Sequence, residues 1–177
     1  MVFRFGFQNA NKATQECPCG FYNHPEKDCV CAPGVVQKYL SKISGPLLDR
    51  IDLHVDVTPV NFTELASKEE TEKSGEISTR VIRAREIQDR RFEDKEDLHY
   101  NAQMSPKMVR KVCRTSNEEN ALLKSAVERL GLSARAYDRI LKVARTIADL
   151  DGSENVELEH LAESINYRSL DRDGWAG

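Results

Sequence analysis

Four of the chain's five cysteines lie between residues 17 and 31, in the segment CPCGFYNHPEKDCVC. They form two Cys-x-Cys pairs, and turn-forming residues between the pairs, among them Gly20 and Pro25, allow the second pair to fold back onto the first. Four thiolates placed about 2.3 Å from one Zn²⁺ make a closed tetrahedral site. We therefore predict a structural zinc site formed by Cys17, Cys19, Cys29 and Cys31.

Two other interpretations of this segment stay open at this point. His24 could replace one thiolate as a ligand, and the four cysteines could also be reduced or partly oxidised thiols in a surface loop. A catalytic metal is disfavoured, because four thiolates leave no open position for water. The fifth cysteine, Cys113 in VRKVCRTS, is expected to be a buried helix residue and not a ligand.

Composition limits the class of protein. The chain has 177 residues, of which 40% are hydrophobic and 31% are charged, with a formal net charge of -3. No apolar run approaches the roughly 20 residues that cross a membrane, and the start MVFRFGFQNANK has no secretion signal. We therefore expect a cytoplasmic protein with no membrane partner, where thiols stay reduced and clustered cysteines favour metal binding.

One helix and one strand are predicted after the cysteines. Apolar residues at helical spacing indicate a helix over 33–44, which the pair Gly45-Pro46 should end. In RIDLHVDVTPV, apolar residues at 51, 53, 55 and 57 alternate with polar residues such as His54, which predicts a half-buried strand. The polar residues 61–75 are predicted to be a linker.

The rest of the chain has the pattern of four or five short amphipathic helices, which together make a small bundle. One helix is predicted over 76–92, and Ser105 and Ser116 are predicted N-caps of the next two. A longer helix follows in SARAYDRILKVARTIADLDG, and NVELEHLAESINYR supplies the last one. One face of the longer helix is apolar and is formed by Ala136, Ile140, Val143, Ala144 and Ile147.

Charge is unevenly distributed over this helical region. Residues 105–145 contain ten Lys or Arg and four acidic residues. Residues 146–177 contain two Lys or Arg and eight acidic residues. Arg135, Arg139 and Lys142 are spaced to form a stripe along one helix, beside its apolar face. The stripe is either an ordinary solvated face or a surface that meets an anion, such as a nucleotide phosphate or a nucleic acid.

Several phrases, in order, closely resemble the C-terminal part of magnesium-chelatase-like AAA+ ATPases of the ComM/YifB type. They are CPCGFYNHPEKDCVC, LSKISGPLLDRIDLHVDV, NAQM, LSARAYDRILKVARTIADLDG and HLAESINYRSLD, and the resemblance covers roughly residues 17–172. It implies a mainly α fold: a helical-bundle AAA+ lid domain, preceded by the last helix and strand of the AAA+ core and a cysteine-rich, zinc-type loop.

The resemblance also implies the domain boundaries. Residues 17–60 would be the end of the AAA+ core with the four-cysteine loop, 61–75 the linker, 76–172 the lid and 173–177 a tail. Residues 1–16 are atypical, because Gln15 and Glu16 stand where the family has Asn-Pro before its cysteines.

The nucleotide machinery of the family is only partly present in this sequence. No G-x-x-x-x-G-K-[ST] motif occurs, and no apolar strand ends in Asp-Glu to hold Mg²⁺. The chain alone is therefore not expected to hydrolyse ATP, and ATP and Mg²⁺ are expected only in a full-length protein. The family that the sequence resembles consists of ATPases, so enzyme activity is expected of a full-length parent protein and not of this chain alone.

Two arginines match functional positions of the family. Arg50, in GPLLDRIDL, matches the arginine finger that reaches the γ-phosphate held by a neighbouring subunit, and Arg135, in LSARAYDRIL, matches the sensor 2 arginine. Each also has an ordinary alternative, because Arg50 could pair with Asp49 or Asp52 and Arg135 could pair with Asp138.

The resemblance implies ATP-driven DNA remodelling or branch migration during natural transformation, by a hexamer in which neighbouring AAA+ subunits are the partners. Single-stranded or branched DNA is a further expected partner, through the basic region 105–145 or through Phe21, Tyr22 and Lys27 in the cysteine loop. The alternatives are a non-enzymatic, zinc-bearing helical interaction module and the ATPase subunit of a metallochelatase.

Overall fold

The computed structural model divides the chain into two units, which are described separately. Met1–Glu69 with Tyr167–Gly177 make the first unit, and Glu70–Asn166 make the second, here called the helical unit. Within the part of the chain that the structure describes, no helix is long and apolar enough to cross a membrane. The described residues are 2–5, 10–13, 17–22, 24, 26–55, 57, 60, 66 and 71–168.

The first unit contains an antiparallel three-stranded sheet with strand order β2-β1-β3, formed by β1 (Val2–Phe5), β2 (Ala10–Ala13) and β3 (Ile51–Val55). Strand β1 pairs with both neighbours, so that Val2 lies opposite Ala13 on one side and Val55 on the other. The sequence analysis placed no strand before the cysteines, because segments of four residues are too short to show a period.

Two short helices lie between the cysteines and β3. Helix α1 (Pro33–Leu40) starts with proline and buries Val36 and Leu40 one turn apart. The predicted extension of this helix to residue 44 is wrong. Gly45 and Pro46 do not end a helix but begin the next one, α2 (Gly45–Leu48), because proline is tolerated in a first helical turn.

Strand β3 does not follow the predicted alternation. Ile51 and His54 are both buried, whereas Val55 is 39% exposed. The pairing with β1 explains this pattern, because Phe5 lies opposite Ile51 and Arg4 lies opposite Leu53, which leaves Asp52 as an extra residue. Such a bulge rotates the following residues by one position, so that residues three apart face the same side.

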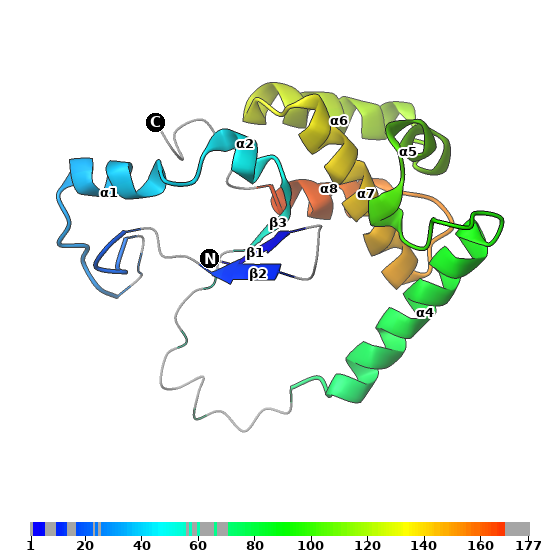
Figure 1. Cartoon of the computed structure of the whole chain (residues 1–177), viewed down its shortest axis with the longest axis horizontal. Coiled ribbons are helices and arrows are strands. Elements are labelled where there is room, and N and C mark those ends of the chain that lie inside the picture. Colours follow the sequence, from blue (N-terminus) through cyan, green and yellow to red (C-terminus); the bar gives the residue numbers. More distant parts are fainter. Residues whose placement is uncertain are drawn as a thin grey trace. The chain divides into compact units, whose positions relative to one another are not determined.

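The helical unit has the predicted bundle of short helices (Figure 1). Helix α7 packs against α4 and α8, while the first half of α4 is exposed and extends beyond the other helices of this unit. The elements are α4 (Ser74–Phe92), the 3₁₀ turn η1 (Asn101–Gln103), α5 (Pro106–Val112), α6 (Asn117–Leu130), α7 (Ala134–Asp151) and α8 (Leu158–Asn166).

Most of the predicted helix ends are observed, although α4 begins at Ser74, two residues before its predicted start. Ser105 and Ser116 accept hydrogen bonds from backbone N–H groups in the first turns of α5 and α6, and Glu119 completes the capping box of α6. Gly131 and Gly152 end α6 and α7 with φ of 60° and 75°, a conformation that glycine adopts without steric cost. These local signals therefore fix the lengths of the helices.

The apolar core of the helical unit is contiguous and draws on every helix from α4 to α8. Its centre is formed by α7 through Ile140, Leu141 and Ala144, whereas Val143 and Ile147 of the predicted apolar face are only half-buried. Cys113 is buried in the core directly after α5, at the C-cap and not inside the helix as expected. Its fully buried members include Val109, Leu123, Ile140, Leu141, Ala144 and Leu161.

A buried carboxylate, Asp149, lies at the side of this core. The Arg91 guanidinium of α4 donates to both of its oxygens, at 2.7 and 2.5 Å, and Arg145 donates from one turn earlier on α7 at 3.1 Å. The side-chain amide of Asn101 donates a further hydrogen bond of 2.7 Å. Asp149 thus ties α4 and η1 to α7.

Arg145 has a second role in the same region. Its guanidinium is buried and donates to the backbone carbonyls of Ser153 and Glu154, at 2.6 and 2.8 Å. Burial and the nearby Arg91 lower the pKa of Arg145, whereas Asp149 opposes this shift. The arginine therefore holds the turn between α7 and α8 only while Asp149 balances its charge.

We expect Asp149→Ala to lower the free energy of unfolding of the helical unit by about 3–5 kcal/mol, because it leaves Arg145 buried without a counter-charge. Urea unfolding followed by helical circular dichroism measures this loss. The matched control is Glu128→Ala, which removes another i,i+4 pair, with Lys124 at 3.9 Å, in which both side chains are exposed. That change should cost no more than about 0.5 kcal/mol. Equal losses in the two variants would contradict the prediction.

Candidate functional site

The structure brings the four predicted ligand residues together. The sulfur atoms of Cys17, Cys19, Cys29 and Cys31 all lie within 4.8 Å of one another. The Cys17 and Cys19 sulfurs are 3.3 Å apart, those of Cys19 and Cys29 are 3.5 Å apart, and those of Cys29 and Cys17 are 3.7 Å apart. None of the four cysteines is in a disulfide.

Local backbone geometry explains why the sulfurs converge. The N–H of Gly20 donates to the Cys17 carbonyl at 3.1 Å, which closes a tight turn around the first pair. Gly20 has a φ of 79°, in the left-handed region that favours glycine. Cys17 is fully buried, and Val36 and Leu40 of α1 pack against the cysteines.

The thiols also share protons unevenly. The backbone N–H of Phe21, together with hydrogen bonds from the neighbouring thiols, lowers the pKa of Cys19 to about 6. The backbone N–H of Cys31 lowers the pKa of Cys29, but burial and hydrogen bonds to the neighbouring sulfurs outweigh it and raise that pKa to about 12. The neighbouring thiols thus favour the thiolate form of Cys19, and a cation bound by the four sulfurs would displace their protons.

The donor set fits a metal ion. Ligands about 2.3 Å from a tetrahedral ion must be about 3.8 Å apart. The three separations among the Cys17, Cys19 and Cys29 sulfurs are within about half an ångström of this value, and the Cys31 sulfur lies within 4.8 Å of the other three. His24 is not part of the cluster among the described residues, and its Nδ1 accepts a hydrogen bond from the Glu26 N–H at 3.1 Å. The cluster can therefore hold a metal ion with four sulfur ligands.

A second group of ligand-type residues does not fit a metal. Donor atoms of Asp151, Glu159 and His160 lie within 4.8 Å of one another. However, Nδ1 of His160 accepts a hydrogen bond from the Glu157 N–H at 2.9 Å, so that a neutral imidazole carries its proton on Nε2. Nε2 lies 3.5 Å from a carboxylate oxygen of Asp151 and faces it as a donor, not as a ligand.

The two predicted nucleotide-facing arginines belong to different units. Arg50 lies in the first unit, in the turn between α2 and β3, and Arg135 lies in the first turn of α7 in the helical unit. Both side chains are exposed. Within the part of the chain that the structure describes, neither forms an ion pair with the aspartates considered as alternatives, Asp49 or Asp52 for Arg50 and Asp138 for Arg135.

The basic stripe of α7 is only partly available to a ligand. Lys142 donates to the Ala102 carbonyl at 2.9 Å, and burial, with a contribution from Arg139, lowers its pKa. Arg145, counted in the basic region, is buried beside Asp149. The exposed basic residues of this region include Lys107, Arg110, Lys111, Arg114 and Arg135.

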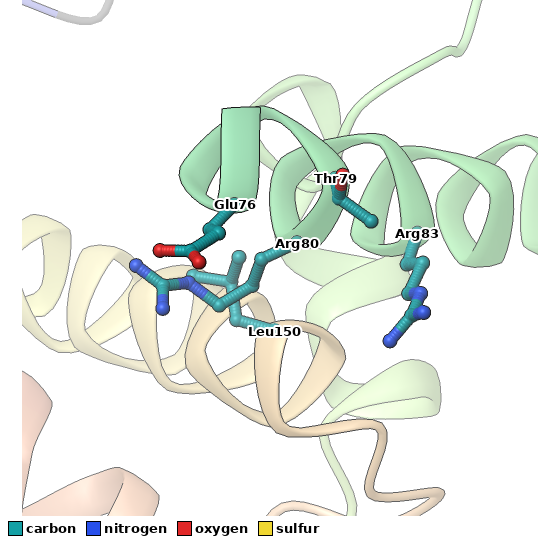
Figure 2. Close-up of a pocket in the computed structure, with 5 residues that line it drawn as sticks. All are labelled: Glu76, Thr79, Arg80, Arg83 and Leu150. Carbon is teal, nitrogen blue, oxygen red and sulfur yellow. The ribbon is translucent and has the colours of Figure 1, made fainter. Parts of the chain in front are cut away.

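A shallow pocket of about 380 Å³ lies beside the exposed half of α4 (Figure 2). Figure 2 shows its lining residues on two helices, four from α4 and Leu150 from α7. The guanidinium of Arg80 donates to both carboxylate oxygens of Glu72, at 2.7 and 3.1 Å, so that its charge is neutralised locally.

Comparison with known proteins identifies the family. Residues 71–168 match the family described as magnesium chelatase, subunit ChlI C-terminal, and residues 7–65 match magnesium chelatase, subunit ChlI. The chain belongs to the magnesium-chelatase family. Arg50 and all four clustered cysteines lie in the matched segment 7–65, and Arg135 lies in the matched segment 71–168.

Relatives within the magnesium-chelatase family confirm the resemblance to ComM/YifB-type proteins. The chain is 37% identical to the competence protein ComM of Haemophilus influenzae over 142 residues, which is 80% of this chain. It is 38% identical to the uncharacterised protein YifB of Escherichia coli over 164 residues, or 90% of this chain. These matches span only 27% and 30% of the relatives' own lengths.

We expect the purified chain to contain about one metal ion, bound by the four clustered sulfurs. Cys17→Ser should abolish metal binding and destabilise the first unit, because structural metal contributes directly to folding. Cys113→Ser, which changes a buried cysteine outside the cluster, should retain the metal. Elemental analysis and thiol titration of both variants measure this. Metal-free folded protein with four reactive thiols besides Cys113 would contradict the assignment.

Proposed function

We propose that this chain is the nucleotide-sensing C-terminal part of an AAA+ ATPase of the ComM/YifB type, acting in ATP-driven DNA remodelling or branch migration during natural transformation. The observation that carries the proposal is the exposure of two guanidiniums, Arg50 and Arg135, in the two segments that match the magnesium-chelatase family. One relative is named a competence protein, which supports a role in natural transformation. In this proposal ATP and Mg²⁺ bind to a P-loop core outside these 177 residues.

Arg50 acts in this proposal on a nucleotide held by a neighbouring subunit of a hexamer. The residue lies directly before β3, in a turn closed by a 3.0 Å hydrogen bond from its own N–H to the Leu47 carbonyl. A guanidinium is always charged, and its fork fits two phosphate oxygens at once. An exposed arginine on a fixed turn therefore suits the stabilisation of a transferring phosphoryl group.

Arg135 acts as the sensor of the nucleotide in the lid. It follows the N-cap Ser133, whose hydroxyl accepts from the Ala136 N–H at 3.1 Å, in the first turn of the 18-residue α7. The positive end of the helix dipole and the guanidinium lie at the same end of the helix, so their attraction for phosphate adds. Loss of the γ-phosphate would remove this attraction and release the helical unit.

The cysteine cluster holds zinc in this proposal. Four sulfur ligands in tetrahedral arrangement are typical of structural zinc, and they leave no position for a substrate. The ion would stabilise a loop that carries exposed groups suited to single-stranded DNA. Tyr22 is 39% exposed, and Lys27 lies 5.0 Å from the ring centre of Phe21. Such aromatic rings can stack on bases while the lysine meets a phosphate.

The ATPase subunit of a metallochelatase is the second candidate, because the matched family is described as magnesium chelatase. The cysteine cluster and the identity to ComM and YifB favour the first candidate. A non-enzymatic zinc-bearing interaction module is the remaining alternative, and it differs from both because it requires no nucleotide. Assays of ATP hydrolysis and DNA binding separate the three.

We expect ATP hydrolysis to depend on both arginines once a P-loop core is supplied. The test is a chimera of Haemophilus influenzae ComM in which this chain replaces the segment that it matches. Arg50→Ala and Arg135→Ala should each lower its turnover roughly 100-fold or more. Arg129→Ala, at another exposed arginine, should leave turnover unchanged.

Two results would overturn this assignment. The first is Mg²⁺-dependent ATP hydrolysis by the 177-residue chain alone, which would mean that a catalytic site exists without a P-loop. The second is an active chimera whose turnover is insensitive to both arginine substitutions.

We expect the chain to bind single-stranded DNA weakly, with affinity falling roughly tenfold between about 50 and 200 mM salt if two or three phosphates are contacted. Fluorescence anisotropy with a labelled oligonucleotide measures this. Tyr22→Ala should weaken binding by about 1–3 kcal/mol, whereas Tyr100→Ala, at an exposed tyrosine of the helical unit, should not. Tight binding that is independent of salt would contradict the expectation.

A further inference from the structure

Arg168 is a buried arginine that the sequence analysis did not single out. Its side chain is 1% exposed, and its guanidinium donates to the carbonyls of Ile51 and of Leu48, the latter at 3.5 Å. These two carbonyls lie on either side of the turn that carries Arg50. We infer that Arg168 is a positioning residue that fixes the turn presenting Arg50 to its phosphate, an inference that rests on the proposed function of Arg50.

The geometry of a guanidinium explains why one side chain can fix this turn. Its N–H groups point outward in a rigid plane, so that two carbonyls bound by the same group are held at a set separation. Leu48 ends α2 and Ile51 begins β3, and both are buried. Without Arg168 their buried carbonyls would lose these donors, and the turn between them would lose a cross-link.

Arg168 is itself held in place by its neighbours. The carbonyl of the preceding residue, Tyr167, accepts a hydrogen bond of 2.8 Å from the backbone N–H of His54 in β3. Burial, and then the positive charge of Arg168, lower the pKa of His54 to about 4, so the imidazole is neutral near pH 7. His54 therefore adds no second positive charge beside Arg168 near pH 7.

The position of Arg168 in the chain gives the contact a further consequence. Helix α8 of the helical unit ends at Asn166, and only Tyr167 separates that helix from Arg168. The residue that fixes the turn of Arg50 is thus tied covalently, over two residues, to the lid that carries Arg135. A displacement of α8 would reach the backbone of Arg168 through this single intervening residue, which is too short a connection to absorb it.

The direct test is nuclear magnetic resonance on the 177-residue chain with Arg168→Lys, which keeps the charge but loses the planar fork. We expect the amide order parameter of Arg50 to fall from a rigid value near about 0.85 to below about 0.6, with the helical unit unchanged. Arg129→Lys is the matched control. An equally rigid Arg50 in the Lys variant would overturn the inference. If the Lys variant unfolds the first unit, the order parameter of Arg50 is measured in Arg168→Gln, which keeps a donor. An equally rigid Arg50 in that variant would likewise overturn the inference.

A second measurement separates this inference from the proposed function. In the ComM chimera, Arg168→Lys should lower kcat roughly 10- to 100-fold with little change in KM for ATP, because a misplaced Arg50 affects the transferring phosphoryl group. If Arg50→Ala leaves kcat unchanged, the proposed role of Arg50 fails, and the order parameter of Arg50 still decides the positioning role. If Arg50→Ala lowers kcat and Arg168→Lys does not, the positioning role is wrong.

Discussion

The charge balance around Asp149 is the constraint on which the helical unit depends. Arg91 and Arg145 come from different helices, and both converge on one carboxylate that water does not reach. Buried charges are tolerated only when they are paired, so the network specifies a single arrangement of α4 against α7. Asp149 lies in the last turn of α7 and Arg135 in the first, about 21 Å apart along a continuous helix. The network thus orients the helix that presents Arg135.

The first unit is stabilised differently. Among the described residues, the apolar cluster around the cysteines has Cys17, Val36 and Leu40 as its buried members, with three half-buried cysteines around them. Cores of this size do not support a fold without additional cross-links, and a metal ion is one of the usual solutions. The sulfur cluster therefore anchors α1, whose own apolar packing is small, whereas Asp149 adds a polar anchor to α7, which is already packed in the apolar core.

Much of the helical unit could be predicted from the sequence, because its signals are local. Caps such as Ser116 and Gly131 and the period of α7 depend on residues a few positions apart. The four cysteines were also predictable, because their spacing allows convergence. The burial of His54 was not, since it follows from a bulge that is defined only by pairing with β1. Arg168 was missed as a buried residue, because its partners are carbonyl groups that no sequence pattern marks. Arg145 was missed although its i,i+4 spacing to Asp149 is visible in the sequence, because such pairs are usually exposed.

The discontinuity of the first unit has a consequence for synthesis of the protein. Glu70–Asn166 form one uninterrupted unit, whereas the first unit needs residues from both sides of it. Chains fold as they leave the ribosome, N-terminal parts first, and contacts between distant residues form late. The hydrogen bond from His54 of β3 to the Tyr167 carbonyl therefore cannot form until the whole helical unit has been synthesised. A nascent chain whose residues up to 166 have emerged from the ribosome would thus contain a complete helical unit and a first unit that still lacks its contacts from Tyr167 and Arg168, a species exposed to chaperones and proteases.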